Sequence, residues 1–170
     1  MELTRRAALG AAAGSLLFAV SGTSAIAENT EVITVSLWDK GADSADMTDA
    51  MMANTGQLIQ NPLTATMGIN IDKRVIPAGT VTFVAVNDSK DIVHEMIVAP
   101  LKPGQTSMPY DSNEHAVKED EAGHLGEVSE LEPGQKGALT VTLKPGDYIL
   151  YCNIPGHFAG GMWTVLTVMK

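Results

Sequence analysis

Cysteine and basic residues are both scarce in this sequence of 170 residues. Cys152 is the single cysteine, and 11 lysines and arginines face 20 aspartates and glutamates. One cysteine cannot form a disulfide within the chain, so its thiol is buried and inert, joined to another molecule, or used chemically. The shortage of basic residues excludes nucleic acid as an expected partner, because phosphate binding requires a basic surface.

The sequence also offers no apolar run suited to a permanent membrane span. The run of residues 7–20 is short and is interrupted by two glycines and a serine. It follows Arg5 and Arg6 and precedes small residues, which is the layout of an export signal at residues 1–27, with the mature chain beginning at Glu28. The paired arginines resemble a twin-arginine signal, but ordinary secretory signals carry them too, so both export routes stay open. We expect a soluble periplasmic protein without stable membrane insertion.

Residues 28–170 are long enough for one domain with a proper core. Loss of the signal removes Glu2, Arg5 and Arg6, which leaves 19 acidic and nine basic side chains and a net charge of −10. Such a charge favours solubility and a weak encounter with a basic partner protein. We predict an N-terminal strand and extension loop at residues 28–65, followed by the main domain at residues 66–170.

Short strand-like runs dominate the rest of the sequence, separated by Pro-Gly and Asn-Asp turn signals. They cover residues 30–38, 66–71, 80–86, 92–99, 137–143, 147–152 and 163–168. We therefore predict an all-β fold, an antiparallel sandwich or barrel. Residues 39–61 are expected to form a long loop with room for a short helix. Residues 111–130 are expected to form an acidic surface insertion, with a short helix that Asp111 or Ser112 caps and that ends near Gly123.

The stretch YCNIPGHFAGGM at residues 151–162 places the lone cysteine at the end of an apolar strand. His157 and Met162 follow Cys152 with the spacing Cys-x4-His-x4-Met, and the next strand begins at Trp163. Sulfur ligands prefer soft metals, imidazole suits copper, and Cys plus two His with a distant Met is the ligand set of a blue-copper electron-transfer site. The loop thus indicates copper. A buried, inert Cys152 and a space-filling Met162 are the alternative interpretation.

Such a site requires a second histidine, and His94 is the best candidate. It lies in the strand-like segment IVHEMIVA, whereas His115 and His124 lie in the acidic insertion, where solvated surface histidines are the usual case. A lone histidine in a strand is more often a core residue with satisfied ring nitrogens. Together with the cysteine loop, His94 becomes the expected fourth member of the set.

These motifs, with PAGTVTFVAVN at residues 77–87 and HEMIV at residues 94–98, resemble the cupredoxin family of blue copper proteins. The likeness runs from about residue 69 to the C-terminus, and the Cys-x4-His-x4-Met loop is similar to that of rusticyanin-type members. The resemblance implies a Greek-key β-sandwich whose one mononuclear type 1 copper is held by His94, Cys152, His157 and Met162. It also implies a monomer that passes electrons through His157, which would reach the surface in an apolar patch formed by Pro155, Phe158, Ala159 and Gly160.

Glu95 departs from the family pattern, in which a small polar residue often follows the first histidine and ties the two ligand strands together. Asn153 follows Cys152 and could donate to Glu95, which would preserve such a tie with different chemistry. A carboxylate beside copper could instead lower its potential or become a ligand, or Glu95 could point to solvent. The sequence leaves these alternatives open.

Two functions fit these residues. The first is single-electron transfer with a redox partner such as a c-type cytochrome or an oxidase. The second is copper tolerance or delivery, because the thioethers of Met47, Met51, Met52 and Met67 could bind Cu(I). An enzyme with Cys152 as nucleophile is not expected, since the cysteine ends a strand and no oxyanion donor accompanies it.

Overall fold

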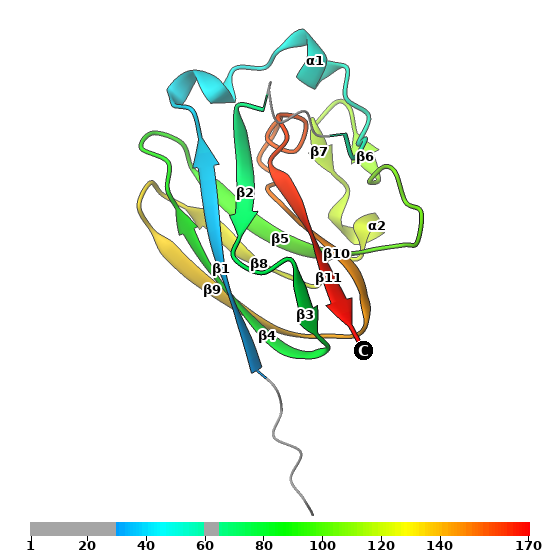
Figure 1. Cartoon of the computed structure of the whole chain (residues 1–170). Coiled ribbons are helices and arrows are strands. Elements are labelled where there is room, and N and C mark those ends of the chain that lie inside the picture. The colour runs from blue at the N-terminus through cyan, green and yellow to red at the C-terminus, as the bar shows by residue number, and fades with distance from the viewer. Residues whose placement is uncertain (1–29, 60–64) are drawn as a thin grey trace, which may run out of the picture.

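Two β-sheets pack face to face in the computed structural model, which describes residues 30–59 and 65–170 (Figure 1). The first sheet has the order β2-β1-β4-β9, and the second has the order β3-β11-β10-β5-β8. The predicted export signal at residues 1–27 lies outside the described residues. The sheet strands are β1 (Thr30–Asp39), β2 (Met67–Ile71), β3 (Val75–Pro77), β4 (Gly79–Asn87), β5 (His94–Leu101), β8 (Gly126–Leu131), β9 (Lys136–Leu143), β10 (Gly146–Tyr151) and β11 (Trp163–Met169).

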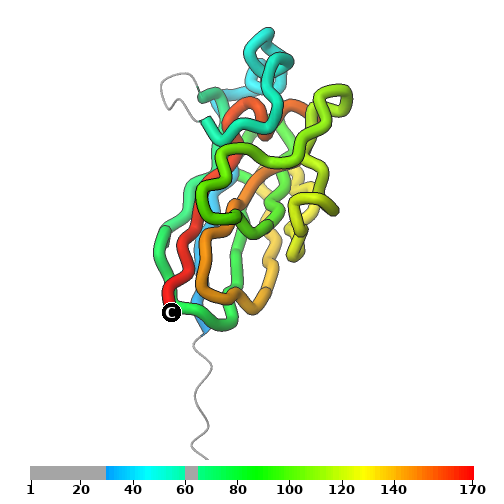
Figure 2. Tube along the Cα trace, turned by 90° about the vertical axis from the view of Figure 1, so that its right-hand side faces the viewer, coloured from blue at the N-terminus to red at the C-terminus, as the bar shows by residue number. Residues whose placement is uncertain are grey.

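Shorter elements lie in two segments outside the sheets, and the first of these covers the end of the sandwich away from the C-terminal residue (Figure 2). The extension between β1 and β2 contains η1 (Ala42–Ala45) and α1 (Asp49–Met52), and the insertion between β5 and β8 contains β6 (Tyr110–Asp111), β7 (Ala116–Val117) and α2 (Glu119–Ala122). In the part of the chain that the structure describes, no helix is long and apolar enough to cross a membrane.

The expected β-sandwich is confirmed, but its sheets are mixed rather than antiparallel throughout. β1 pairs antiparallel with β2 and parallel with β4, and β11 pairs parallel with β3. Parallel neighbours require a long crossover, and the chain between β1 and β4 provides one. β1 buries Ile33, Val35 and Leu37 completely, so the N-terminal strand is part of the sandwich core.

Strand periodicity decides which residues of the second sheet face the first. Successive side chains alternate between the two faces of a strand. On β10, Tyr148 and Leu150 face the core between the sheets, whereas Ile149 and Tyr151 face a second cluster on the outer side. Cys152, the residue after β10, also faces the core between the sheets. Met162, the residue before β11, does the same. The same alternation carries His94 inward at the start of β5, where the side chain is fully buried.

The insertion covers the outer face of the second sheet. Met108, Val117 and Ala122 pack there against residues of β5, β10 and β11. The prediction that a helix begins at Asp111 or Ser112 is wrong, because that stretch forms the β6–β7 hairpin and α2 begins only at Glu119. Its predicted end is confirmed, since Gly123 closes α2 in the left-handed conformation with φ 78°.

Strand β8 was not predicted, because all but its last residue lie in the segment expected to be an acidic surface insertion. β8 pairs with β5 at the edge of the second sheet and buries Val128 and Leu131. Its solvent-facing glutamates hide the apolar alternation. Charged side chains are typical of an edge strand, where they discourage pairing with other chains.

Candidate metal centre

The loop between β10 and β11 is a compact series of turns that brings its two ends together. The N–H of Cys152 donates to the carbonyl of Met162 at 3.0 Å, so both residues lie at the neck of the loop. Within the loop, the N–H of His157 donates to Ile154 at 2.9 Å, and the N–H of Met162 donates to His157 at 3.0 Å. These main-chain bonds fold the loop back on itself, and Nδ1 of His157 lies 3.3 Å from the sulfur of Cys152. Cys152 and Met162 are fully buried.

β5 lies antiparallel to β10 and places His94 beside this loop. Nδ1 of His94 lies 3.3 Å from Nδ1 of His157, and the Sγ atom of Cys152 lies 3.3 Å from the same nitrogen. One ligand atom from each of the three residues lies within 4.8 Å of the other two. Met162 belongs to the same buried cluster as Cys152.

These separations fit a single metal ion. Imidazole nitrogens and thiolate sulfurs lie about 2.0–2.3 Å from a bound metal such as zinc, which separates neighbouring ligand atoms by about 3–4 Å. Two imidazoles, a thiol and a nearby thioether form a soft set of donors that suits copper. The residues present therefore fit a mononuclear copper ion.

The environment keeps the ligand atoms uncharged while no metal is bound. Burial raises the pKa of the Cys152 thiol to about 12. Burial, assisted by the neighbouring His94, lowers the pKa of His157 to about 4. Burial also lowers the pKa of His94, although Asp39 opposes the shift. Both rings thus offer an unprotonated nitrogen at neutral pH, and metal uptake has to displace the thiol proton.

Glu95 ties the two ligand strands together, which resolves one alternative that the sequence left open. Its Oε1 accepts a hydrogen bond from the backbone N–H of Asn153 at 2.8 Å. The partner is therefore the expected residue, but the bond is made by its main chain and not by its side chain. Burial raises the pKa of Glu95 to about 6. Glu95 is not one of the residues whose ligand atoms converge with those of His94, Cys152 and His157.

The Asn153 side chain fastens the insertion to the cysteine loop. Its Oδ1 accepts from the N–H of Val117 at 2.6 Å, and its Nδ2 donates to the carbonyl of Val117 at 2.9 Å and to Glu119 at 2.8 Å. The carbonyl of His115 accepts from the N–H of Gly156 at 2.9 Å, while His115 itself adopts a positive φ of 53°. His115 is therefore more than the solvated surface residue that we expected.

His124 takes part in a second, surface group with Glu119 and Glu127. Its Nδ1 lies 3.8 Å from Glu119, and its Nε2 lies 3.7 Å from Glu127. The two carboxylates face different ring nitrogens, so they do not both approach the nitrogen that would bind a single ion. The structure does not bring either of these histidines to the cysteine loop's ligand cluster.

His157 does not reach the surface through the apolar patch expected from the sequence. The residue is only 3% exposed, and Phe158, an expected member of that patch, is 1% exposed. Phe158 turns inward because it packs against Tyr110, Tyr151 and Trp163. These aromatic contacts under the insertion thus bury a side chain that we expected at the surface.

The extension covers the other side of the loop with methionines. A Cβ atom on Gly156 would collide with the sulfur of Met47 and lie 3.5 Å from the methyl of Met51. A Cβ atom on Gly160 would lie 3.2 Å from Met51 and 3.3 Å from the sulfur of Met67. Gly156 has φ +85°, so both its backbone and its contact with Met47 require glycine.

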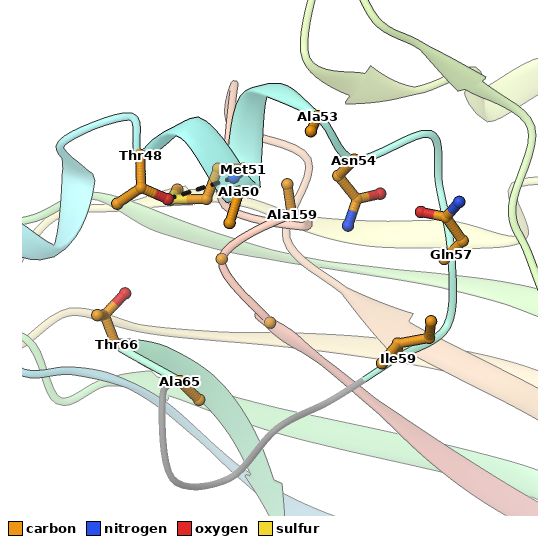
Figure 3. Close-up of a pocket in the computed structure, with 12 residues that line it drawn as sticks. Thr48, Ala50, Met51, Ala53, Asn54, Gln57, Ile59, Ala65, Thr66 and Ala159 are labelled. Carbon is orange, nitrogen blue, oxygen red and sulfur yellow. Dashed lines mark hydrogen bonds between the residues drawn. The ribbon is translucent and has the colours of Figure 1, made fainter.

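A groove of about 430 Å³ opens between the extension and the cysteine loop (Figure 3). Ala159, Gly160 and Gly161 form one wall, and α1 with Thr48 and Met51 forms another. The N–H of Met51 donates to the Thr48 hydroxyl at 3.2 Å, which caps the short helix. Ile59 lines the groove and is 75% exposed. The backbone of the cysteine loop is thus accessible from the groove.

Three residues around His94 were missed as functional candidates. Asp39 contacts the ring of His94, and Ser89 and Asn87 belong to the same buried polar network. The turn composition of residues 87–89 is the only sequence signal that points to this network, and it does not distinguish a structural turn from a metal site.

A family profile described as the sulfocyanin (SoxE) domain matches residues 64–170. The chain belongs to the sulfocyanin family. Sulfocyanins are cupredoxins, so the resemblance seen in the sequence is confirmed, and the cofactor is a single type 1 copper ion. As a cupredoxin, the protein is assigned to electron transport. Strand β1, which ends at Asp39, and helix α1 precede the matched residues.

Solved structures show the same fold. Rusticyanin from Thiobacillus ferrooxidans has a TM-score of 0.53 and 16% identity, with 82% of this chain and 77% of that chain covered. Auracyanin B has a TM-score of 0.52 and 18% identity, with 84% of this chain and 91% of that chain covered. No curated protein matches this sequence.

Proposed function

We propose that Nδ1 of His94, Sγ of Cys152 and Nδ1 of His157 hold the copper, with the thioether of Met162 as a weaker fourth ligand. The convergence of these three donor atoms, each on a buried residue, carries the proposal. Copper bound there supplies a one-electron Cu(I)/Cu(II) couple. The chain then acts as a periplasmic carrier of single electrons between redox partners.

The surrounding residues restrict movement of the ligands. Cys152 and Met162 are joined at the loop neck, and the Glu95–Asn153 hydrogen bond joins the strand of His94 to the loop. A scaffold that keeps the donor atoms in place in both oxidation states reduces the rearrangement that accompanies each transfer. This role requires rigidity and not a reactive group, in agreement with the expectation that the protein is not an enzyme.

The groove beside the cysteine loop supports a docking role. Its walls are mainly apolar, and the extension that forms one of them also carries the exposed acidic residues Asp43, Asp46 and Asp49. Acidic groups around an apolar contact favour a partner with a basic rim and speed the encounter. A c-type cytochrome or an oxidase domain with such a surface is the expected partner of this monomer.

The visible spectrum is the primary test. Residues 28–170 retain every element of the described structure, and this chain is to be purified and mixed with one equivalent of Cu(II). We expect an intense thiolate-to-copper band that is missing from Cys152→Ser, whose metal-free unfolding curve serves as the control for folding. No band in the unaltered protein overturns the proposal.

Copper tolerance or delivery is the alternative function. It requires methionines that are free to collect Cu(I), but Met51 and Met67 are 5% and 0% exposed and pack against other residues. Met52, at 48% exposed, is the accessible member of the group. More than one tightly bound Cu(I) per chain would favour delivery, whereas rapid, salt-dependent electron exchange with a basic cytochrome would favour the carrier.

A further inference from the structure

Asp39 places a buried carboxylate against the outer nitrogen of His94. Asp39 is the last residue of β1, and its side chain is 2% exposed. Its Oδ2 lies 2.9 Å from Nε2 of His94, whose side chain is fully buried. Burying a charge is costly unless other groups compensate for the lost water. Hydrogen-bond donors around Asp39 would therefore indicate that the structure stabilises a buried carboxylate at this position.

Several donors compensate for the burial of Asp39. The N–H of Gly41 donates to Oδ1 at 2.7 Å, and the Ser89 side chain also bonds to the carboxylate. The Ser89 hydroxyl oxygen accepts from the N–H groups of Asp91 and Ile92 at 3.1 and 2.9 Å, so its single proton is free to point at Asp39.

Asn87 holds the turn that presents Ser89. Its Oδ1 accepts from the N–H of Ser89 at 3.0 Å, and its Nδ2 donates to the carbonyls of Ile92 and Leu131 at 2.8 and 2.7 Å. The side chain is fully buried. The carboxylate thus sits at the end of a connected polar network and not in a loose surface contact.

The ring geometry fixes the proton of His94. Nδ1 faces His157 and the other ligand atoms, so the neutral ring carries its proton on Nε2, which donates to Asp39. A carboxylate that accepts this proton fixes the tautomer, orients the ring and makes Nδ1 a stronger donor. Its negative charge also interacts more favourably with a doubly charged ion than with a singly charged one.

We propose that Asp39 is a positioning residue that orients His94 and biases the site toward Cu(II), which lowers the reduction potential. This inference rests on the proposed copper ligands. Asp39 ends strand β1, which precedes residues 64–170 that match the family.

Asp39→Asn is the decisive variant, because it removes the charge and keeps the shape and an acceptor oxygen. We expect its ratio of Cu(II) to Cu(I) affinity to fall about tenfold or more. A tenfold change raises the potential of a one-electron couple by about 59 mV. The visible band should keep its position, since the ring stays oriented. Asp39→Ala should raise the potential and also alter the band and the copper hyperfine splitting.

Glu31→Gln is the matched control. Glu31 lies near the other end of β1 and bonds to Lys73 at the surface at 2.7 Å, so the variant removes the same charge far from His94. A shift in Asp39→Asn no larger than the shift in Glu31→Gln overturns the proposal for Asp39 while leaving the copper site intact. Absence of the blue band from the unaltered protein overturns both proposals.

Nitrogen NMR of the unaltered Cu(I)-loaded protein decides the matter without a variant, should Asp39→Asn fail to fold. We expect His94 to carry its proton on Nε2, in slow exchange with water, as a buried bond to a carboxylate requires. A His94 ring with an unprotonated Nε2, or with a proton that exchanges as fast as that of an exposed histidine, would exclude the hydrogen bond to Asp39.

Discussion

The insertion and the extension flank the cysteine loop from two sides and hold it by different means (Figure 1). The insertion uses directed hydrogen bonds, through Asn153 to Val117 and Glu119 and through the carbonyl of His115 to Gly156. The extension instead lays methionine side chains on the glycines of the loop. The contact with the insertion depends on hydrogen-bond geometry, whereas the contact with the extension depends on flexible, polarizable side chains.

This difference separates two tasks. The hydrogen-bonded side fixes the backbone that positions Cys152 and His157, and a lost partner there leaves polar groups unsatisfied. The methionine side covers Gly156 and Gly160, borders the groove and can be repacked at lower cost. We therefore expect substitutions on the insertion side to affect stability first, and those on the extension side to affect partner contact first.

Gly156→Ala should have the largest effect, because Gly156 contacts both sides. The new methyl group would strain a backbone at φ +85° and collide with Met47. We expect a loss of about 2–4 kcal/mol in the free energy of unfolding, measured by denaturant titration of the metal-free protein. Gly134→Ala is the control, since Gly134 has φ +78° and open space around it. It should lose only about 1 kcal/mol. Equal losses would show that Met47 moves aside freely.

Asn153→Ala tests the insertion side alone. It removes three side-chain hydrogen bonds and leaves the N–H and carbonyl of Val117 without these partners. We expect a loss of about 1–3 kcal/mol and faster hydrogen exchange at the Val117 amide. Alanine at the exposed strand residue Asn70 is the control. Unchanged exchange at Val117 would mean that the insertion is held by its apolar contacts instead.

Met51→Leu tests the extension side with little change in volume. Met51 is 5% exposed and contacts both Gly156 and Gly160. We expect a change below about 1.5 kcal/mol, because Leu and Met exchange well in cores. The blue band should stay unchanged, since the ligand residues are not displaced. A shifted band would show that the methionines help to position His157, and would remove the contrast between the two sides.

Met52→Gln should have the smallest effect on stability. Met52 is 48% exposed, and substitutions at such surface positions usually change the free energy of unfolding by about 0.5 kcal/mol or less. An electron carrier should also keep its stoichiometry of one Cu(I) per chain, measured by competition with a Cu(I) chelator. A fall from a higher stoichiometry to one would instead support copper delivery by the extension.

The sequence predicted the parts of the structure that depend on local patterns. Alternation identified β1, β4, β5, β9, β10 and β11, and the same alternation turns His94 and Cys152 toward the interior. It failed at β8, where solvent-facing glutamates hide the pattern, and at β6 and β7, where strands of two residues each are too short to show a period. Helix α2 was placed correctly only at its end, because Gly123 marks it.

The chain by itself determined the chemistry of the site, since the residue types and the spacing around Cys152 specify soft metal ligands on one strand-loop-strand unit. Only the tertiary structure decided what surrounds them. Asp39 meets His94 across 55 residues, and the methionines of the extension cover a loop about 100 positions further along the chain. Such contacts depend on how the sheets and loops pack. No local pattern encodes them, so the partners of the ligands had to be seen in the fold.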